Sequence, residues 1–279
     1  MLVVLATALF GTIGTARVLG PEASSWSVGS WRMLAAALVL VAVAGHRDGL
    51  GPLRSLVRTR AAWVAGAGQA AFQLTFLTAV ERTGVALTTL VAIGSAPLIT
   101  GLVTRSVSRR WAVATGLGIV GLALLVGGSK GAVSGPAVLL PLAAGAAYSG
   151  YTVASGRLNE RASSASVTAA GFVLAAVILS PSLLFADHRW LLGIDGLSML
   201  AYLSLVATAA AYLLFVKGLR TVPAATAQTL GLTEPVVATL LGVLVLGETL
   251  DLTGIAGAVL VLLALGVLAT QRRAPVVLG

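Results

Sequence analysis

Glu234 is a carboxylate inside an apolar run, TLGLTEPVVATLL, and it directly precedes Pro235. An ionised carboxylate deep in hydrocarbon costs several kcal/mol unless it faces water, a partner or the interior of a helix bundle. Proline has no N–H, so Pro235 leaves the carbonyl of Gly231 without its helical partner, and Pro97 does the same for Ile93. Freed carbonyls are tolerated where they line a cavity. We therefore expect both prolines to break their helices as hinges, with Glu234 in the cavity wall.

Glu234 has two functional interpretations and one structural interpretation. In a cavity, the carboxylate could bind a substrate ammonium group or carry a proton. Alternatively, the carboxyl group is neutralised by a hydrogen bond and only fixes helix packing. Arg32, in the apolar run GSWRMLAAALVLV, also has more than one interpretation. It can pair with Glu234, bind a substrate carboxylate, or extend its guanidinium outward along its own stem.

Amides and aromatic rings supply further candidates for a substrate site. Gln69 and Gln73 lie one helical turn apart, and Phe72 and Phe76 form a neighbouring i,i+4 pair. Amides beside aromatic rings suit an amphipathic, amino-acid-like solute, although such amides also form ordinary hydrogen bonds between helices. The remaining candidate lining residues are Ser95, Tyr148, Tyr151, Tyr212 and Gln228.

Enzymatic chemistry finds no support in the sequence. His46 and His188 fall in predicted loops, and neither an HExxH motif nor a phosphate-cradling loop is present. The chain has no cysteine, which excludes disulfides and thiolate metal sites. We therefore expect no enzyme activity, no metal and no cofactor.

The composition places these residues in a membrane protein. The 279 residues are 58% hydrophobic and 10% charged, with a mean hydropathy of +1.01, whereas a soluble domain is about 25% charged. Apolar runs of roughly 17–25 residues, the length that spans a bilayer, predict an all-α protein with ten transmembrane helices. The runs are 2–19, 26–45, 62–80, 83–104, 111–128, 136–156, 165–186, 196–216, 222–246 and 253–270.

The basic residues are distributed unevenly between the two sides of this ten-helix arrangement. With the N-terminus inside, the outer side holds only Arg17, Arg82, Lys130 and Arg189. This positive-inside bias accounts for the net charge of +9 without nucleic acid. It predicts a multi-pass protein of the cytoplasmic (inner) membrane with both termini in the cytoplasm. The thirteen inner basic residues are Arg47, Arg54, Arg58, Arg60, Arg105, Arg109, Arg110, Arg157, Arg161, Lys217, Arg220, Arg272 and Arg273.

The two halves of the chain resemble each other. An offset of 138 positions aligns residues 82–126 with 220–264 and gives twelve identities in 45, among them Pro97 with Pro235. We therefore predict two repeats, 1–131 and 132–279, of five helices each. Because five is odd, the second repeat enters the membrane from the opposite side, an arrangement typical of secondary transporters. The fifth and tenth helices, rich in small residues and poor in polar ones, are expected to be scaffold.

Three segments carry a resemblance to a known family. LTEPVVATLLGVLVLGETL, followed by a glycine-bearing last helix, is similar to the second repeat of the EamA family of the drug/metabolite transporter superfamily. AAYSGYTVASGRL resembles the sixth helix of that family, and GSWRMLAAALVLV resembles its second, with Arg32 at the family's arginine. Tyr148 departs from the many relatives that carry tryptophan there. The resemblance covers the whole chain and implies an exporter of amino acids or other small metabolites.

These observations predict a secondary transporter that exports small metabolites, with amino acids as the first substrate class, by alternating access. The alternatives are a lipid or polyprenyl-carrier flippase and a drug or organic-cation exporter of the same superfamily. The expected partners are a small-molecule substrate and the lipid bilayer, with protons added if Glu234 is a coupling group. The sequence leaves open whether the protein is a monomer or a homodimer.

Overall fold

Most helices of the protein lie along predicted apolar runs, but the runs 62–80 and 83–104 fall in a single helix of 45 residues. The computed structural model describes residues 1–126 and 138–269, and this part of the chain contains helices and no strand. Lys130, Arg272, Arg273 and the predicted boundary between residues 131 and 132 lie outside the described residues. The main helices are α1 (Leu2–Gly11), α2 (Ile13–Leu19), α3 (Ser25–Asp48), α4 (Leu50–Leu56), α5 (Arg60–Thr104), α6 (Arg109–Val126), α7 (Leu139–Leu158), α8 (Ser164–Leu179), α9 (Ile194–Ala201), α10 (Ala211–Gly218), α11 (Ala224–Leu230), α12 (Thr233–Leu246) and α13 (Leu252–Ala269).

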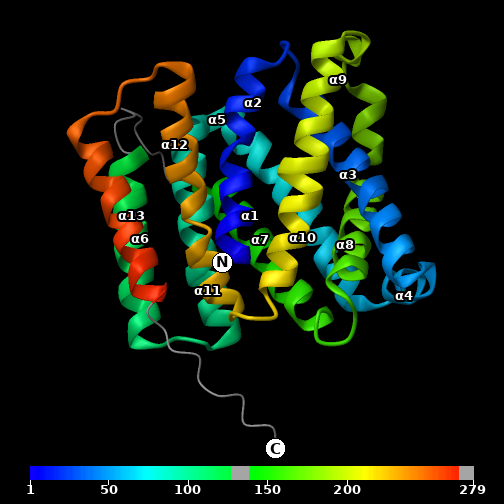
Figure 1. Ribbon diagram of the computed structural model, residues 1–279, viewed down its shortest axis with the longest axis horizontal. Coiled ribbons are helices and arrows are strands. Elements are labelled where there is room, and N and C mark those ends of the chain that lie inside the picture. Colours follow the sequence, from blue (N-terminus) through cyan, green and yellow to red (C-terminus); the bar gives the residue numbers. More distant parts are fainter. Residues whose placement is uncertain (127–137, 270–279) are drawn as a thin grey trace, which may run out of the picture.

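Eight helical segments of the described chain are long and apolar enough to cross a membrane. This confirms the prediction of an all-helical membrane protein. Figure 1 shows these segments side by side, running mostly along one direction. The segments are Leu2–Leu19, Ser25–Asp48, Arg60–Thr104, Arg109–Val126, Ser164–Phe185, Ile194–Gly218, Ala224–Leu246 and Leu252–Ala269.

The longest helix, α5, consists of two arms that meet at Gly84. This residue has φ 79° and ψ 163°, a conformation essentially restricted to glycine, and it interrupts the helical geometry. Val64 near the start of the helix and Val103 near its end line the same cavity. The chain therefore reverses direction at Gly84. α7 packs against both arms.

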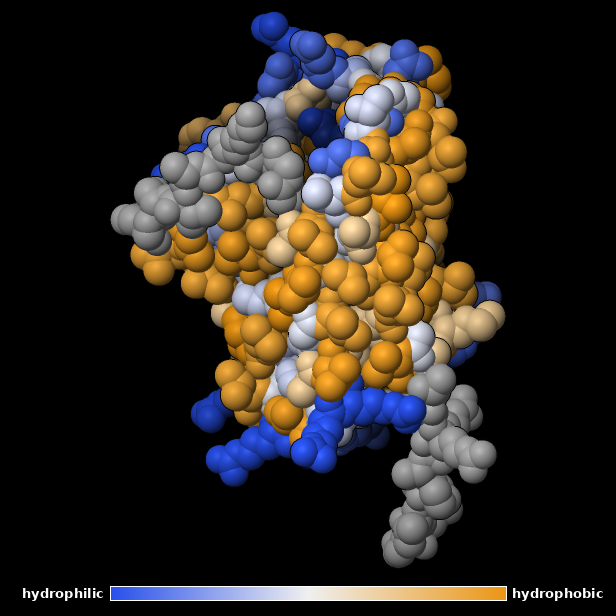
Figure 2. Space-filling model, turned by 90° about the vertical axis from the view of Figure 1, so that its left-hand side faces the viewer, coloured by the Kyte–Doolittle hydropathy of each residue, from blue (hydrophilic) through white to orange (hydrophobic). Residues whose placement is uncertain are grey.

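Basic side chains gather at one end of the molecule, which we call the basic end. Cavities there bring together the end of α7 at Arg157, the end of α5 at Thr104 and the α10–α11 connection at Arg220. The end of α3 joins them, because the carboxylate of Asp48 accepts hydrogen bonds from Ser163 and from Ser166, the latter at 2.7 Å. Figure 2 shows the hydrophilic side chains at the ends of the molecule and a hydrophobic band between them, as expected for a bilayer-spanning protein.

α6 and α13 form a close pair at one edge of the bundle (Figure 1). A Cβ added to Gly121 would lie 2.7 Å from the carbonyl oxygen of Gly257, and one added to Gly257 would lie 2.4 Å from the backbone nitrogen of Leu125. Only glycine permits this backbone approach. At the start of α13, Asp251 accepts hydrogen bonds from the Gly254 N–H and the Thr253 hydroxyl, which lower the pKa of its carboxyl.

Candidate functional site

Two hydrogen-bonded pairs of predicted residues join separate helices. The guanidinium of Arg32 on α3 donates to Gln73 Oε1 on α5 at 3.1 Å. Gln69 Nε2, one turn earlier on α5, donates to the hydroxyl of Tyr212 on α10, also at 3.1 Å. Gln69 is 1% exposed, and its Oε1 has no partner within the described residues. The helical spacing of the two amides therefore places a cation, two amides and a phenol in one row.

Glu234, on α12, lies within electrostatic range of this row. It lies close enough to Arg32, Tyr148 and Tyr212 to interact with them electrostatically. Arg32 directs its hydrogen bond to Gln73, and the described part of the chain contains no direct ion pair between Arg32 and Glu234. An acid and a base thus lie within electrostatic range of the same tyrosines without forming a direct ion pair, an arrangement suited to a ligand with both charges.

Aromatic rings fill the space beside these polar groups. Five of the six phenylalanines and three of the four tyrosines form one connected set, which we call the aromatic cluster. Ring centroids lie 5.1 Å apart for Phe72 and Tyr148 and 5.6 Å apart for Tyr151 and Tyr212, within the range of favourable aromatic pairs. The cluster comprises Phe10, Phe72, Phe76, Tyr148, Tyr151, Phe172, Tyr212 and Phe215.

Three cluster members were not among the predicted site residues. Phe215 lies three residues after Tyr212 on α10, so helical spacing could have identified it. Phe10 and Phe172 are single phenylalanines in apolar helices, and nothing in their local sequence distinguishes a ring in the core from one in lipid. Their assignment requires the packing of α1 and α8 against α10.

Two predicted lining residues make contacts of another kind. Ser95 Oγ donates to the carbonyl of Ala92 in its own helix at 3.3 Å. Gln228 Nε2 on α11 donates to Thr152 Oγ1 on α7 at 2.6 Å and to the carbonyl of Tyr148 at 3.4 Å. Gln228 thus ties α11 to α7 beside Tyr148 of the aromatic cluster. Thr152, its main partner, was not predicted.

The helical segment is interrupted before Pro235, between α11 and α12, but the interruption leaves few backbone carbonyls without a hydrogen bond. The carbonyl of Gly231, expected to be free, accepts the N–H of Glu234 at 3.0 Å. The carbonyl of Leu230 accepts the hydroxyl of Thr233 at 2.8 Å and that of Thr7 at 3.4 Å. A tight turn replaces the lost helical bond, which corrects the expectation of an unpaired carbonyl at this site.

Pro97 behaves differently from Pro235. α5 continues through Pro97 to Thr104, and its only non-helical residue is Gly84. One missing hydrogen bond need not end a helix when neighbouring helices hold both sides, and α7 packs along this arm. The expectation that both helices break at matching positions is therefore wrong for Pro97.

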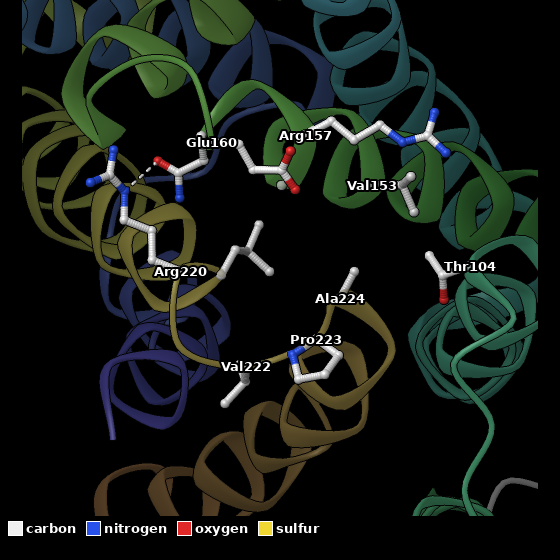
Figure 3. A pocket seen from close by; sticks show the side chains of 11 residues that line it. Thr104, Val153, Arg157, Glu160, Arg220, Val222, Pro223 and Ala224 are labelled. Carbon is white, nitrogen blue, oxygen red and sulfur yellow. Dashed lines mark hydrogen bonds between the residues drawn. The ribbon is translucent and has the colours of Figure 1, made fainter. Parts of the chain in front are cut away.

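A cavity of about 450 Å³ opens at the basic end, between α7, the end of α5 and the α10–α11 connection. Arg157 and Arg220 lie on opposite sides of it (Figure 3). Arg220 is fixed by Asn159 Oδ1 at 3.1 Å and by the carbonyl of Ala162 at 2.6 Å. Asn159 in turn donates to the carbonyl of Val216 at 2.7 Å, tying α7 to α10. None of the predicted site residues lines this cavity.

The fold and this interior define a polytopic membrane protein with polar and aromatic side chains between its helices. Comparison with known proteins agrees with this class of protein. Residues 135–270 match the EamA-like transporter family. The chain is 36% identical to an uncharacterized transporter, YwfM, of Bacillus subtilis (strain 168), over 285 residues that cover 98% of this chain and 94% of the relative. A protein of known crystal structure has the same fold, with a TM-score of 0.82 at 20% identity, covering 96% of this chain and 95% of that chain.

The chain therefore belongs to the EamA-like transporter family, within the drug/metabolite transporter superfamily. The family resemblance noted in the sequence is confirmed. It makes the protein a membrane transporter and points away from an enzyme.

Proposed function

We propose that this transporter exports small metabolites, with amino acids as the first substrate class, by alternating access across the cytoplasmic membrane. The observation that supports this most is the site between Arg32 and Glu234. Arg32 can bind a carboxylate and Glu234 an ammonium group, while Gln69, Gln73 and the aromatic cluster contact the rest of an amphipathic solute. Small-molecule sites commonly combine mostly apolar walls with a few such polar groups.

The helices are consistent with ten crossings in two inverted repeats. Counting α5 as two arms joined at Gly84 gives nine crossings from the eight long segments, and α7, with 20 residues, gives a tenth. In this arrangement the first repeat ends with α6 and the second with α13. These two helices pack against each other at the edge of the bundle, as expected for scaffold.

The cavity at the basic end would be the cytoplasmic mouth of the transport path. Ala224 lines it, and Gln228 lies one turn deeper on α11. The hydrogen bond from Gln228 to Thr152 stands between this mouth and Tyr148 of the aromatic cluster. We infer that this bond closes the path on the inner side and that the helix break before Pro235 serves as a hinge when it opens.

The test is counterflow in liposomes that contain the purified protein, screened across amino acids, organic cations and nucleosides. Uptake of an amino acid that depends on the protein supports the proposal, and exclusive uptake of organic cations would identify a drug exporter instead. Glu234→Gln is expected to abolish the pH dependence of counterflow, because the amide cannot release a proton. The control is Glu248→Gln, which changes an exposed carboxylate between α12 and α13. A pH dependence that persists in Glu234→Gln would assign Glu234 to packing.

A further inference from the structure

An apolar groove of about 300 Å³ lies beside the mouth, between the two arms of α5 and over one face of α7. Ala61 and Val64 form one wall, and Ile99 and Val103 form the other. Val64 is 53% exposed and Val103 60% exposed, so the groove opens on the outer surface of the bundle. This surface belongs to the hydrophobic band, where lipid is the solvent.

The floor of the groove is a regular stripe on α7 that ends at a charge. Its residues recur at the spacing of one helix face. Ser149 is the one hydroxyl among them, and it is already bonded to the carbonyls of Ala96 at 3.0 Å and Gly145 at 2.8 Å, so it offers the groove little polarity. The floor consists of Ala146, Ser149, Gly150, Val153, Ala154 and Arg157.

Arg157 is the charged residue of the groove, and it also lines the mouth. Its side chain is exposed, and its guanidinium has no hydrogen-bond or ion-pair partner within the described residues. In Figure 3 it extends from α7 toward Val153 and Thr104, away from Arg220. A guanidinium at this position can grip a phosphate with two parallel hydrogen bonds.

The length of the groove matches one leaflet of a bilayer. Ala146 and Arg157 are eleven residues apart on α7, which corresponds to about 16 Å at 1.5 Å per residue. Half of the hydrocarbon core is about 15 Å. An acyl chain whose phosphate lies at the membrane surface would therefore fill the groove from Arg157 to Ala146.

We propose that this groove binds a phospholipid of the inner leaflet, with one acyl chain between the arms of α5 and the phosphate on Arg157. The lipid would be a resident ligand, distinct from the exported solute, and it would set the charge at one side of the mouth. The recognised chemistry is a diacylglycerol phosphodiester from the bilayer. A lipid without phosphate would fill the groove but leave Arg157 unpaired.

Native mass spectrometry of the detergent-purified protein tests this proposal with three added lipids that carry the same acyl chains. Dioleoyl phosphatidylglycerol and dioleoyl phosphatidylethanolamine are expected to remain bound, and dioleoylglycerol, which has no phosphate for Arg157, is expected to bind about tenfold more weakly. Arg157→Ala should weaken phospholipid binding about tenfold, the factor that one charge-assisted hydrogen bond supplies at a partly exposed site. Arg161→Ala is the matched control, because Arg161 is a nearby exposed arginine that lines neither cavity.

A second variant tests the acyl chain. A Cβ at Gly150 meets no atom within 4 Å, so Gly150→Leu places its side chain in the groove without a backbone clash and should abolish binding of both phospholipids. Gly116→Leu adds the same side chain at an exposed, equally open position on α6 and should leave binding unchanged. Undiminished lipid binding in Gly150→Leu would overturn the proposal. Displacement of the lipid by a transported solute would also overturn it, because the groove would then belong to the substrate path.

Discussion

Tyr212 is the residue on which the central contacts converge. Its ring packs against Phe10, Tyr151 and Phe172, and its hydroxyl accepts the hydrogen bond from Gln69. Tyr212→Phe keeps the ring contacts but leaves a buried amide without its acceptor. We expect a loss of about 1–2 kcal/mol in stability, measured as a lower Tm in detergent, and weaker substrate affinity in counterflow.

The control for this prediction is Tyr202→Phe, which removes a comparable 2.8 Å bond to Thr12 at an exposed position. It should change the Tm by less, because Thr12 keeps its hydrogen bond to the carbonyl of Leu9 at 2.7 Å, so no polar group is left unpaired. Adding Gln69→Leu to Tyr212→Phe should recover part of the stability, since the unpaired amide is then gone. Equal Tm values for the two Tyr→Phe variants would show that the buried hydrogen bond from Gln69 to Tyr212 stabilises the protein no more than the exposed bond of Tyr202 does.

At the scale of single residues, the sequence identifies side chains that are neighbours on one helix, but it does not identify their hydrogen-bond partners on other helices. The spacing of Gln69 with Gln73 and of Phe72 with Phe76 followed from the helical period alone. That Tyr212 would be the partner of Gln69 depends on how α10 and α5 are placed across the interior of the bundle, and this required the structure. The roles of these residues in substrate binding stay a prediction.

Among the elements, α5 depends on one glycine. Gly84 adopts φ 79° and ψ 163°, and a Cβ added there meets no atom within 4 Å. Gly84→Ala is therefore disfavoured by backbone conformation alone, at a cost of about 1–3 kcal/mol. The expected result is a lower Tm in detergent. Gly14→Ala on α2, equally free of contacts but helical in conformation, should be neutral or stabilising because alanine favours helix. If the two variants had the same Tm, the turn at Gly84 would be unstrained.

Approximate helix spans were predictable because lipid demands continuous apolar runs of a set length. The predicted run 26–45 lies within α3, and the run 83–104 matches the second arm of α5. What happens at a proline was not predictable, since Pro235 follows a break while Pro97 sits within the continuous second arm of α5. The difference depends on whether neighbouring groups replace the hydrogen bond that proline removes. The sequence of one helix does not identify those groups.

At the scale of the whole molecule, composition and motifs were sufficient to identify the class of protein. A chain with 10% charged residues cannot cover a water-soluble core, and the EPVV segment of the second half resembled the family to which the chain belongs. The inverted repeat stays a prediction. It rests on an alignment in which Arg82 corresponds to Arg220, and it has a direct geometric consequence: the two arginines must lie on opposite sides of the membrane.

This consequence can be measured with little interference, because the chain has no cysteine and each introduced thiol is therefore unique. We expect Arg82→Cys to react with a membrane-impermeant maleimide on intact cells, and Arg220→Cys to react only after permeabilisation. Arg161→Cys, between α7 and α8 at the basic end, serves as the inside reference, and Asp251→Cys, before α13, serves as the outside reference. Labelling of Arg82→Cys and Arg220→Cys from the same side would rule out an odd number of crossings between them, and with it the two oppositely oriented repeats on which alternating access depends.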